Sequence, residues 1–184
     1  MSRSRDAALL GTRLVLGGYL AAHGAQKLFG WFDGPGLDAA GAGFDHIGLH
    51  PGRPMAAVAG LSEFGGGLLT MAGLADPLGP VALAGTMAVA STVHRESGPL
   101  SAKGGFELPL TNLGTALALA VSGPGRYSVD GITGRRLTRG STRLLLLAAA
   151  VASAGPIAML LRKKPEAVAT AEEPSDGPTL EVVS

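Results

Sequence analysis

Five ionisable side chains interrupt the long apolar stretches of this sequence, and they are the residues best suited to chemistry. Arg13, His23 and Lys27 lie in the first stretch, Glu63 lies near the centre of the second, and Glu107 opens the fourth. A lone charge at the middle of a membrane costs about 2.5–3.5 kcal/mol on insertion scales. Such groups therefore face the interior of a bundle, where they can relay protons or hydrogen-bond the carbonyl groups of a ligand.

The first stretch predicts a helix with one polar stripe. At about 100° per residue, Arg13, His23 and Lys27 lie on the same side of the helix as Gly17 and Gly24. The remaining positions are mostly leucine, valine and alanine. A helix of this kind hides its polar stripe inside a bundle and presents its other faces to lipid.

Glu63 needs a partner, and the sequence offers two. If the first two stretches form an antiparallel hairpin, Glu63 lies at a depth between Arg13 and His23. We therefore expect it to pair either with Arg13 or with the His23 and Lys27 end of the stripe. A buried ion pair that only fixes the register of two helices explains the same pattern. Lys27 and Glu107, near the ends of their spans, can also extend to water.

Neither the charged set nor the histidines predict a catalytic or metal site. The spacing of His23, Glu63, His94 and Glu107 matches no known ligand motif, so we predict no bound metal. No catalytic residue is predicted either. The set is expected to line a polar pocket within the bundle.

Composition places the chain among membrane proteins. Of its 184 residues, 46% are hydrophobic and 16% are charged, whereas soluble domains carry about 25% charged residues. The deficit is concentrated in long uncharged segments. A net charge of +1, without a basic stripe, indicates no nucleic-acid partner. The absence of cysteine excludes disulfide, thiolate and cysteine-ligated metal chemistry by this chain.

The apolar runs predict an all-α fold, a membrane-embedded four-helix bundle. Its spans are expected at about residues 7–29, 54–74, 78–93 and 106–122. Trp31 and Phe32 follow the first span, where aromatic anchors at a membrane interface belong. The loop over residues 33–53 is expected to carry a short surface helix near residues 38–47.

The C-terminal part predicts further elements. A fifth apolar run, residues 144–161, is long enough to cross a membrane. The tail holds five acidic residues and three prolines, a composition typical of disorder. We therefore divide the chain into a polar N-terminus (1–6), a four-helix membrane domain (7–136), an arginine-rich linker with the fifth helix (137–164) and the tail (165–184).

The distribution of lysine and arginine predicts the orientation. With four spans, seven arginines lie on the side of the N-terminus and four lysines or arginines lie on the other side. This excess favours a cytoplasmic N-terminus. If the fifth run also crosses the membrane, the numbers of lysines and arginines on the two sides become equal. The sequence then does not decide on which side of the membrane the tail lies.

The segment from residue 123 to 130, with the sequence GPGRYSVD, ends the fourth span. Proline cannot continue a helix, and glycine allows a positive φ. Arginine and tyrosine then lie at the level of the lipid headgroups. We expect an interface anchor formed by Gly123, Gly125, Arg126, Tyr127 and Asp130.

Four of these separated elements, taken in order, resemble the DoxX family of small bacterial membrane proteins. The first is Arg13 followed by His23, Gly24, Lys27 and Leu28. The second is the run EFGGGL that begins at Glu63, the third is FELP at residues 106–109, and the fourth is GPGRYSVD. The resemblance covers about residues 7–136.

The resemblance implies a four-helix bundle in the bacterial cell membrane and a role in redox metabolism. One branch of the family is similar to the membrane subunit of a thiosulfate:quinone oxidoreductase. Another is associated with a membrane complex that holds a superoxide dismutase and a sulfurtransferase, and with thiol and oxidative-stress balance. Quinone is therefore the expected cofactor, and soluble oxidoreductases of these kinds are expected partners.

Three functions fit the sequence. The first is a membrane subunit of a redox complex that handles a quinone through Arg13, His23, Lys27, Glu63 and Glu107. The second is a non-catalytic scaffold that recruits soluble oxidoreductases through its loops and tail. The third is a small-solute or proton transporter, which four short spans without an inverted repeat favour least. The glycine-rich second span also permits a homo-oligomer.

Overall fold

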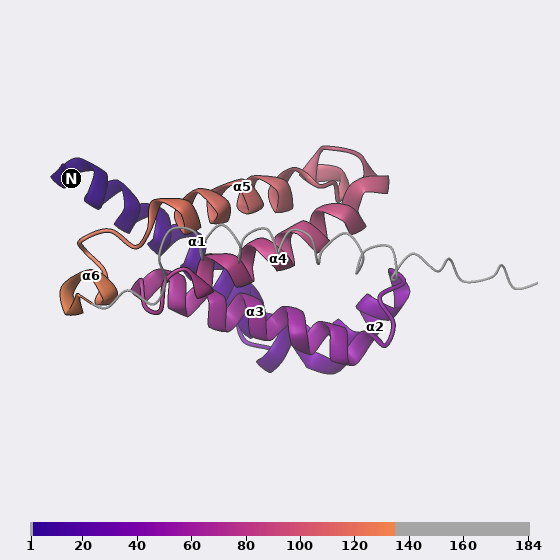
Figure 1. Cartoon of the computed structure of the whole chain (residues 1–184). Helices are drawn as coiled ribbons and strands as arrows, with labels where there is room; N and C mark the ends of the chain where they lie inside the picture. The colour runs from indigo at the N-terminus through magenta and orange to yellow at the C-terminus, as the bar shows by residue number, and fades with distance from the viewer. Residues whose placement is uncertain (1, 135–184) are drawn as a thin grey trace, which may run out of the picture.

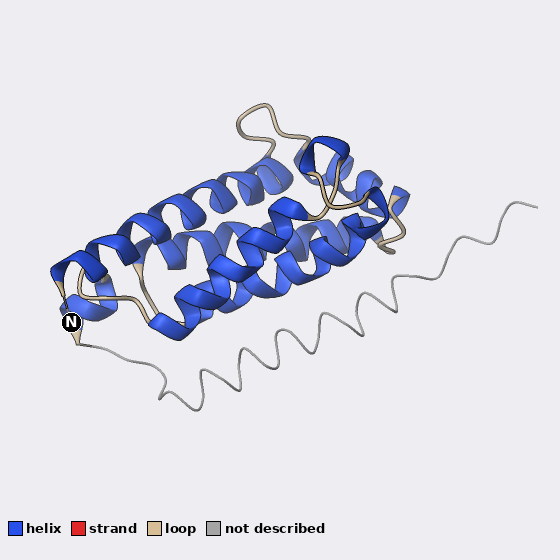
Figure 2. Cartoon of the chain, turned by 90° about the horizontal axis from the view of Figure 1, so that it is seen from above, coloured by secondary structure: helices blue, strands red, loops and turns tan. Residues whose placement is uncertain are grey.

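The computed structural model describes residues 2–134, and every regular element within them is helical. Figure 2 shows this part as packed helices joined by short loops. The predicted all-α fold is therefore confirmed for the described residues. The predicted fifth helix, most of the arginine-rich segment and the acidic tail lie outside them.

Four long helices and four shorter elements make up the described part. The long helices are α1 (Arg3–Phe29), α3 (Gly52–Ala72), α4 (Leu78–Val93) and α5 (Glu107–Ser122). The shorter elements are α2 (Gly36–His46), η1 (His94–Ser97), η2 (Ser101–Lys103) and α6 (Val129–Thr133). A helix occupies each of the four segments expected to be spans, and the expected surface helix is also present, whereas α6 lies in a segment expected to be a loop.

The long helices run up and down, and they give the bundle two distinct ends. The N-terminal end holds the start of α1, the turn between α3 and α4, the end of α5, and α6 (Figure 1). The opposite end holds α2, η1 and η2. Helix α1 packs mainly on α3, α3 also packs on α4, and α4 packs on α5, whereas contact between α1 and α5 is limited.

Helix α1 begins earlier than the sequence pattern indicated. The side chain of Ser2 accepts a hydrogen bond from the backbone N–H of Arg5 at 3.4 Å, which satisfies one of the free donors of the first turn. Asp6 follows in that turn, where a negative charge is favoured by the helix dipole. Most of the expected polar N-terminus is thus the first turn of α1.

Glycines set the close approach of α1 and α3. A Cβ atom placed on Gly17 would lie 2.6 Å from the carbonyl oxygen of Gly67, and one placed on Gly24 would lie 2.6 Å from that of Gly60. These distances leave no room for a side chain. The two backbones therefore touch, as small residues allow in membrane helix pairs, and this contact fixes the register of α1 against α3.

Apolar side chains fill the centre of the bundle and also cover much of its outside. The core consists of Leu16, Leu20, Leu83, Ala84, Met87, Ala116 and Leu119. Large apolar side chains are exposed on every long helix, among them Val15, Leu61, Leu78 and Leu108. Of the helices within residues 2–134, α3 is the one whose length and composition suffice to cross a membrane.

Candidate functional site

Lys27 and Glu63 form an ion pair between α1 and α3. The Glu63 side chain is 7% exposed and that of Lys27 is 24% exposed. Helical side chains lean toward the N-terminus of their helix, so Lys27 reaches back along α1 and Glu63 leans along α3 toward it. The sequence left two partners open for Glu63, Arg13 or the His23 and Lys27 end of the stripe. In the structure the partner is Lys27. The pair offsets much of the cost of burying the carboxylate.

Three more polar side chains surround this pair. The rings of Tyr19 and His23 meet edge to face with centroids 5.5 Å apart. Glu63 lies close enough to Tyr19 to act on it electrostatically, and Asn112 approaches the same phenol from α5. The Asn112 amide also donates to the sulfur of Met87 at 3.8 Å. Tyr19, His23, Lys27, Glu63 and Asn112 are called the inner cluster below.

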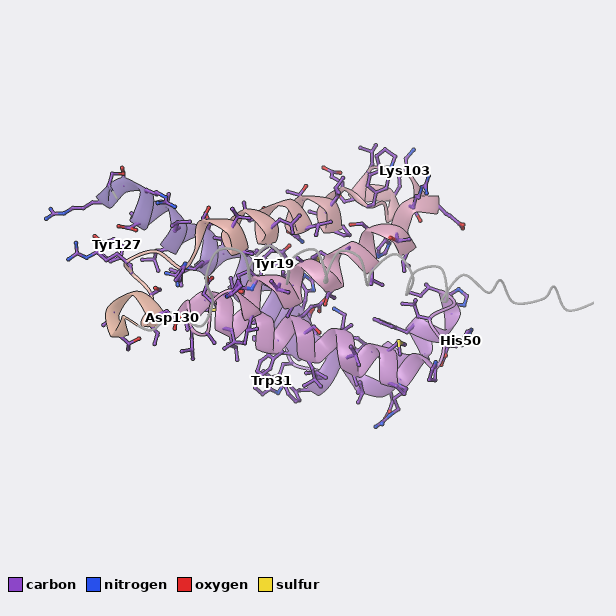
Figure 3. The ribbon with its side chains drawn as sticks, in the orientation of Figure 1. Tyr19, Trp31, His50, Lys103, Tyr127 and Asp130 are labelled. Carbon is purple, nitrogen blue, oxygen red and sulfur yellow. The ribbon has the colours of Figure 1, made fainter. Side chains whose placement is uncertain are left out.

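The inner cluster is partly open to its surroundings. His23 is exposed, and Tyr19, Lys27 and Asn112 are half-buried. Figure 3 shows Tyr19 midway along the bundle. The cluster therefore combines a buried carboxylate with hydrogen-bond donors that an incoming molecule can reach.

Sequence reasoning missed Asn112 and assigned Tyr19 to packing. A signal for Asn112 was present, because an amide within an apolar span is costly unless it has a partner. Tyr19 contacts His23 within α1, but its interactions with Glu63 and Asn112 come from other helices and leave no local signal.

An aromatic group lies beside the ion pair. Phe64 follows Glu63, and its ring lies 5.4 Å from that of Phe29 and 6.4 Å from that of Trp31. The carbonyl of Phe32 accepts a hydrogen bond from the Gln26 side chain at 3.3 Å, which holds the turn after α1. Trp31 and Phe32 are exposed, as the prediction of an aromatic interface anchor requires.

Arg13 lies in a separate network at the N-terminal end. Its side chain is 2% exposed, and its guanidinium donates to the backbone carbonyls of Tyr127 and Met71, the latter at 3.5 Å. Asp76 acts on it electrostatically. The positive charge thus sits at the C-terminal end of α3, where the helix dipole favours it.

Arg13, the other partner that the sequence left open for Glu63, does not pair with it. Glu63 pairs with Lys27, and Lys27 lies about 21 Å along α1 from Arg13 at 1.5 Å per residue. The glycine contacts place Glu63 at the His23 and Lys27 end of the stripe. Polar side chains on one stripe have therefore separated into two networks.

Asp130 joins the Arg13 network from α6. Its carboxylate accepts the backbone N–H of Ala75 at 3.1 Å and of Asp76 at 2.8 Å, and its own N–H donates to the carbonyl of Gly73 at 3.1 Å. Asp130 is buried and lies at the N-terminal end in Figure 3. Within the predicted interface anchor, Asp130 is therefore an internal link to the turn between α3 and α4.

The rest of the GPGRYSVD segment is held through its backbone. Gly123 follows the last residue of α5, and Gly125 has a φ of +74°. The N–H of Arg126 donates to the Asp6 carboxylate at 3.1 Å, and the carbonyl of Tyr127 binds Arg13. The side chains of Arg126 and Tyr127 are left exposed.

Glu107 lies at the opposite end, away from the inner cluster. Its carboxylate accepts the backbone N–H of Ser101 at 3.1 Å and approaches the Ser101 hydroxyl at 3.3 Å. Of the five predicted pocket residues, the structure therefore brings together His23, Lys27 and Glu63. Across residues 2–134, no three histidine or acidic side chains are grouped so as to hold a metal ion.

Comparison with known proteins adds one match. Residues 8–95 match the DoxX family model, a range that includes α2, α3, most of α1 and all of α4. No match was found among curated proteins or among solved structures. The matched range contains four of the five residues of the inner cluster.

Proposed function

This chain belongs to the DoxX family and is a membrane protein, and from that premise we propose that it binds a quinone headgroup at the inner cluster. In this proposal it crosses the bacterial plasma membrane several times, with its N-terminus in the cytoplasm. It acts there as the membrane subunit of a redox and thiol-homeostasis complex.

The apolar surface of the long helices supports several crossings. At 1.5 Å per residue, α1 is about 40 Å long and α3 about 32 Å, whereas α4 and α5 are about 24 Å each. A hydrocarbon core is about 30 Å thick. The short elements η1 and η2 extend α4 and α5 at one end. Exposed leucine and valine side chains on the long helices give lipid tails an apolar surface to contact.

The observation that carries the proposal is the Lys27–Glu63 pair, with a buried carboxylate and a partly accessible ammonium. A quinone presents two carbonyl oxygens, which need donors. Lys27 supplies an ammonium, and Tyr19 and Asn112 supply a hydroxyl and an amide. The donor set therefore fits the group.

Glu63 is placed to orient the Lys27 ammonium toward a bound headgroup. Its carboxylate lies at the inner side of the cluster, and His23 lies at the outer side. A bound quinone supplies the redox chemistry, because the described residues bind, orient and exchange protons. In the proposed complex, electrons come from a soluble oxidoreductase partner.

The test uses the one tryptophan of the chain. Trp31 contacts Phe64, the neighbour of Glu63, so its fluorescence reports on binding beside the ion pair. We would titrate the purified full chain with a short-chain ubiquinone analogue in detergent. Saturable quenching is expected for the wild type and for Glu107→Gln, the matched control from the opposite end.

Variants of the inner cluster decide the outcome. Glu63→Gln removes the carboxylate that positions the Lys27 ammonium, and His23→Gln removes the exposed imidazole at the outer side of the cluster. Each is expected to weaken binding by about 10-fold. His23 is exposed, so its substitution should leave folding intact. Equal quenching curves for wild type, Glu63→Gln and His23→Gln would remove the quinone site from this cluster.

A further inference from the structure

The N-terminal end of the bundle has an unusual separation of charge. Its three aspartates, Asp6, Asp76 and Asp130, are all buried, with exposures of 4%, 5% and 4%. Asp6 accepts the backbone N–H of Arg126, and Asp130 accepts those of the turn between α3 and α4. Their negative charges are thus directed into the fold.

The charged side chains left on the surface of this end, among the described residues, are arginines. Arg3, Arg5 and Arg126 are exposed. The Arg5 guanidinium donates to the carbonyl of Ser122, the last residue of α5, at 3.3 Å. The backbone N–H of Arg126 donates to the carboxylate of Asp6, the residue after Arg5. The backbone that carries Arg126 is therefore held close to the first turn of α1, which carries Arg5.

The opposite end of the bundle does not share this excess of exposed basic side chains. Its exposed charges are mixed, and the acids outnumber the bases. They are Asp33, Asp38, Asp45, Arg53, Arg95, Glu96, Lys103 and Glu107. An anion approaching the molecule is therefore attracted to the N-terminal end.

Apolar and amphipathic side chains flank the arginines. Ile132 of α6 is 81% exposed, and Val129 and Tyr127 are also exposed. Figure 1 shows α6 at the same end as the start of α1. Arginine, tyrosine and exposed aliphatic groups together suit the boundary between lipid headgroups and acyl chains.

We propose that Arg5 and Arg126, with Arg3 beside them, bind the headgroup phosphate of an anionic phospholipid in the cytoplasmic leaflet. The guanidinium group matches the geometry of phosphate oxygens. The exposed side chains of α6 contact the upper part of the acyl chains. This inference rests on the membrane embedding proposed above and is independent of the quinone site.

A lipid accounts for the site better than free phosphate does. Free phosphate would use the arginines and leave Ile132 and Val129 exposed without a role. Each basic residue near an anionic membrane surface contributes about 1 kcal/mol of binding. Removing both Arg5 and Arg126 should therefore weaken lipid binding by about 30-fold.

The test measures lipid binding to the full chain in neutral detergent by native mass spectrometry. The probes are phosphatidylglycerol, phosphatidylcholine and inorganic phosphate. The variant is Arg5→Gln with Arg126→Gln, and the matched control from the opposite end is Arg95→Gln with Lys103→Gln. A third variant, Arg5→Lys with Arg126→Lys, keeps the charge and guards against effects of misfolding.

We expect the wild type and the control to bind phosphatidylglycerol more tightly than phosphatidylcholine. The glutamine variant should lose about 30-fold in affinity, and the lysine variant should retain most of it. Equal phosphatidylglycerol binding by wild type and the glutamine variant would overturn the proposal. So would binding of inorganic phosphate as tight as that of the lipid, or equal loss in the control variant.

Discussion

The carboxylate of Asp130 accepts the backbone N–H of Asp76 at 2.8 Å, in the turn between α3 and α4. Its second oxygen accepts the N–H of Ala75 at 3.1 Å. One side chain near the end of the described chain thus closes a turn that lies more than fifty residues earlier. Together with Arg13, it ties α1, α3, α4 and α6 at the N-terminal end.

Asp130→Asn should destabilise the protein. The asparagine amide keeps one acceptor oxygen and turns its NH₂ group toward a buried backbone N–H, which is left without a partner. Such a group costs about 1–3 kcal/mol. Thermal unfolding of the purified full chain should show a clearly lower midpoint. Asp33→Asn, at an exposed position with a φ of +57°, is the control and should unfold as the wild type does.

Charge reversal should separate the two networks. Lys27→Glu and Glu63→Lys each place like charges in contact, whereas the double variant restores an ion pair and should unfold at a temperature nearer to that of the wild type than either single variant. Arg13→Glu with Glu63→Arg should show no such rescue, because these side chains are not neighbours. Rescue in the second pair, or none in the first, would contradict the assigned partners.

The glycine contacts between α1 and α3 predict opposite effects for two similar substitutions. Gly24→Ala would place its Cβ 2.6 Å from the carbonyl oxygen of Gly60, so the helices must separate and stability should fall by about 2 kcal/mol or more. Gly65 has no atom within 4 Å of an added Cβ. Gly65→Ala should be neutral or stabilise α3 by up to about 1 kcal/mol. Chemical denaturation in detergent measures both, and similar losses in the two variants would argue against the close contact.

Arg13→Lys tests the need for a planar group. The guanidinium reaches two carbonyls, those of Met71 and Tyr127, and a lysine ammonium cannot span both in the same way. We expect a loss of about 1–3 kcal/mol, the range for a broken buried hydrogen bond. Arg53→Lys at the exposed contact with Asp38 should change stability by less than about 1 kcal/mol. Equal effects at the two sites would show that the Arg13 contacts contribute little.

Much of the fold followed from the sequence because apolar runs and helix-ending residues are local signals. The span expected at residues 78–93 is α4 without change, and the expected surface helix is α2 within two residues. The early start of α1 at Arg3 depends on capping by Ser2. That signal is small beside the basic, polar character of the first residues.

The sequence offered two partners for Glu63 but could not decide between them, and it did not indicate the partners of Arg13 and Asp130. The register of α1 against α3 depends on where Gly17 and Gly24 contact the facing backbone, and an antiparallel hairpin drawn from span midpoints places Glu63 too close to Arg13. Asp130 was assigned to the surface because GPGRYSVD resembles a helix end followed by an anchor. Its role depends on contacts with a distant turn, which no local pattern contains.

The most direct test of the quinone site is to extract the full chain from its own membranes with a mild detergent and identify the lipophilic molecules that remain bound. We predict that a quinone copurifies in near-stoichiometric amount with the wild type and with Glu107→Gln. The amount should fall at least several-fold in Glu63→Gln and in His23→Gln. Absence of quinone from the wild type, or equal amounts in all four proteins, would contradict a quinone site at the Lys27–Glu63 pair.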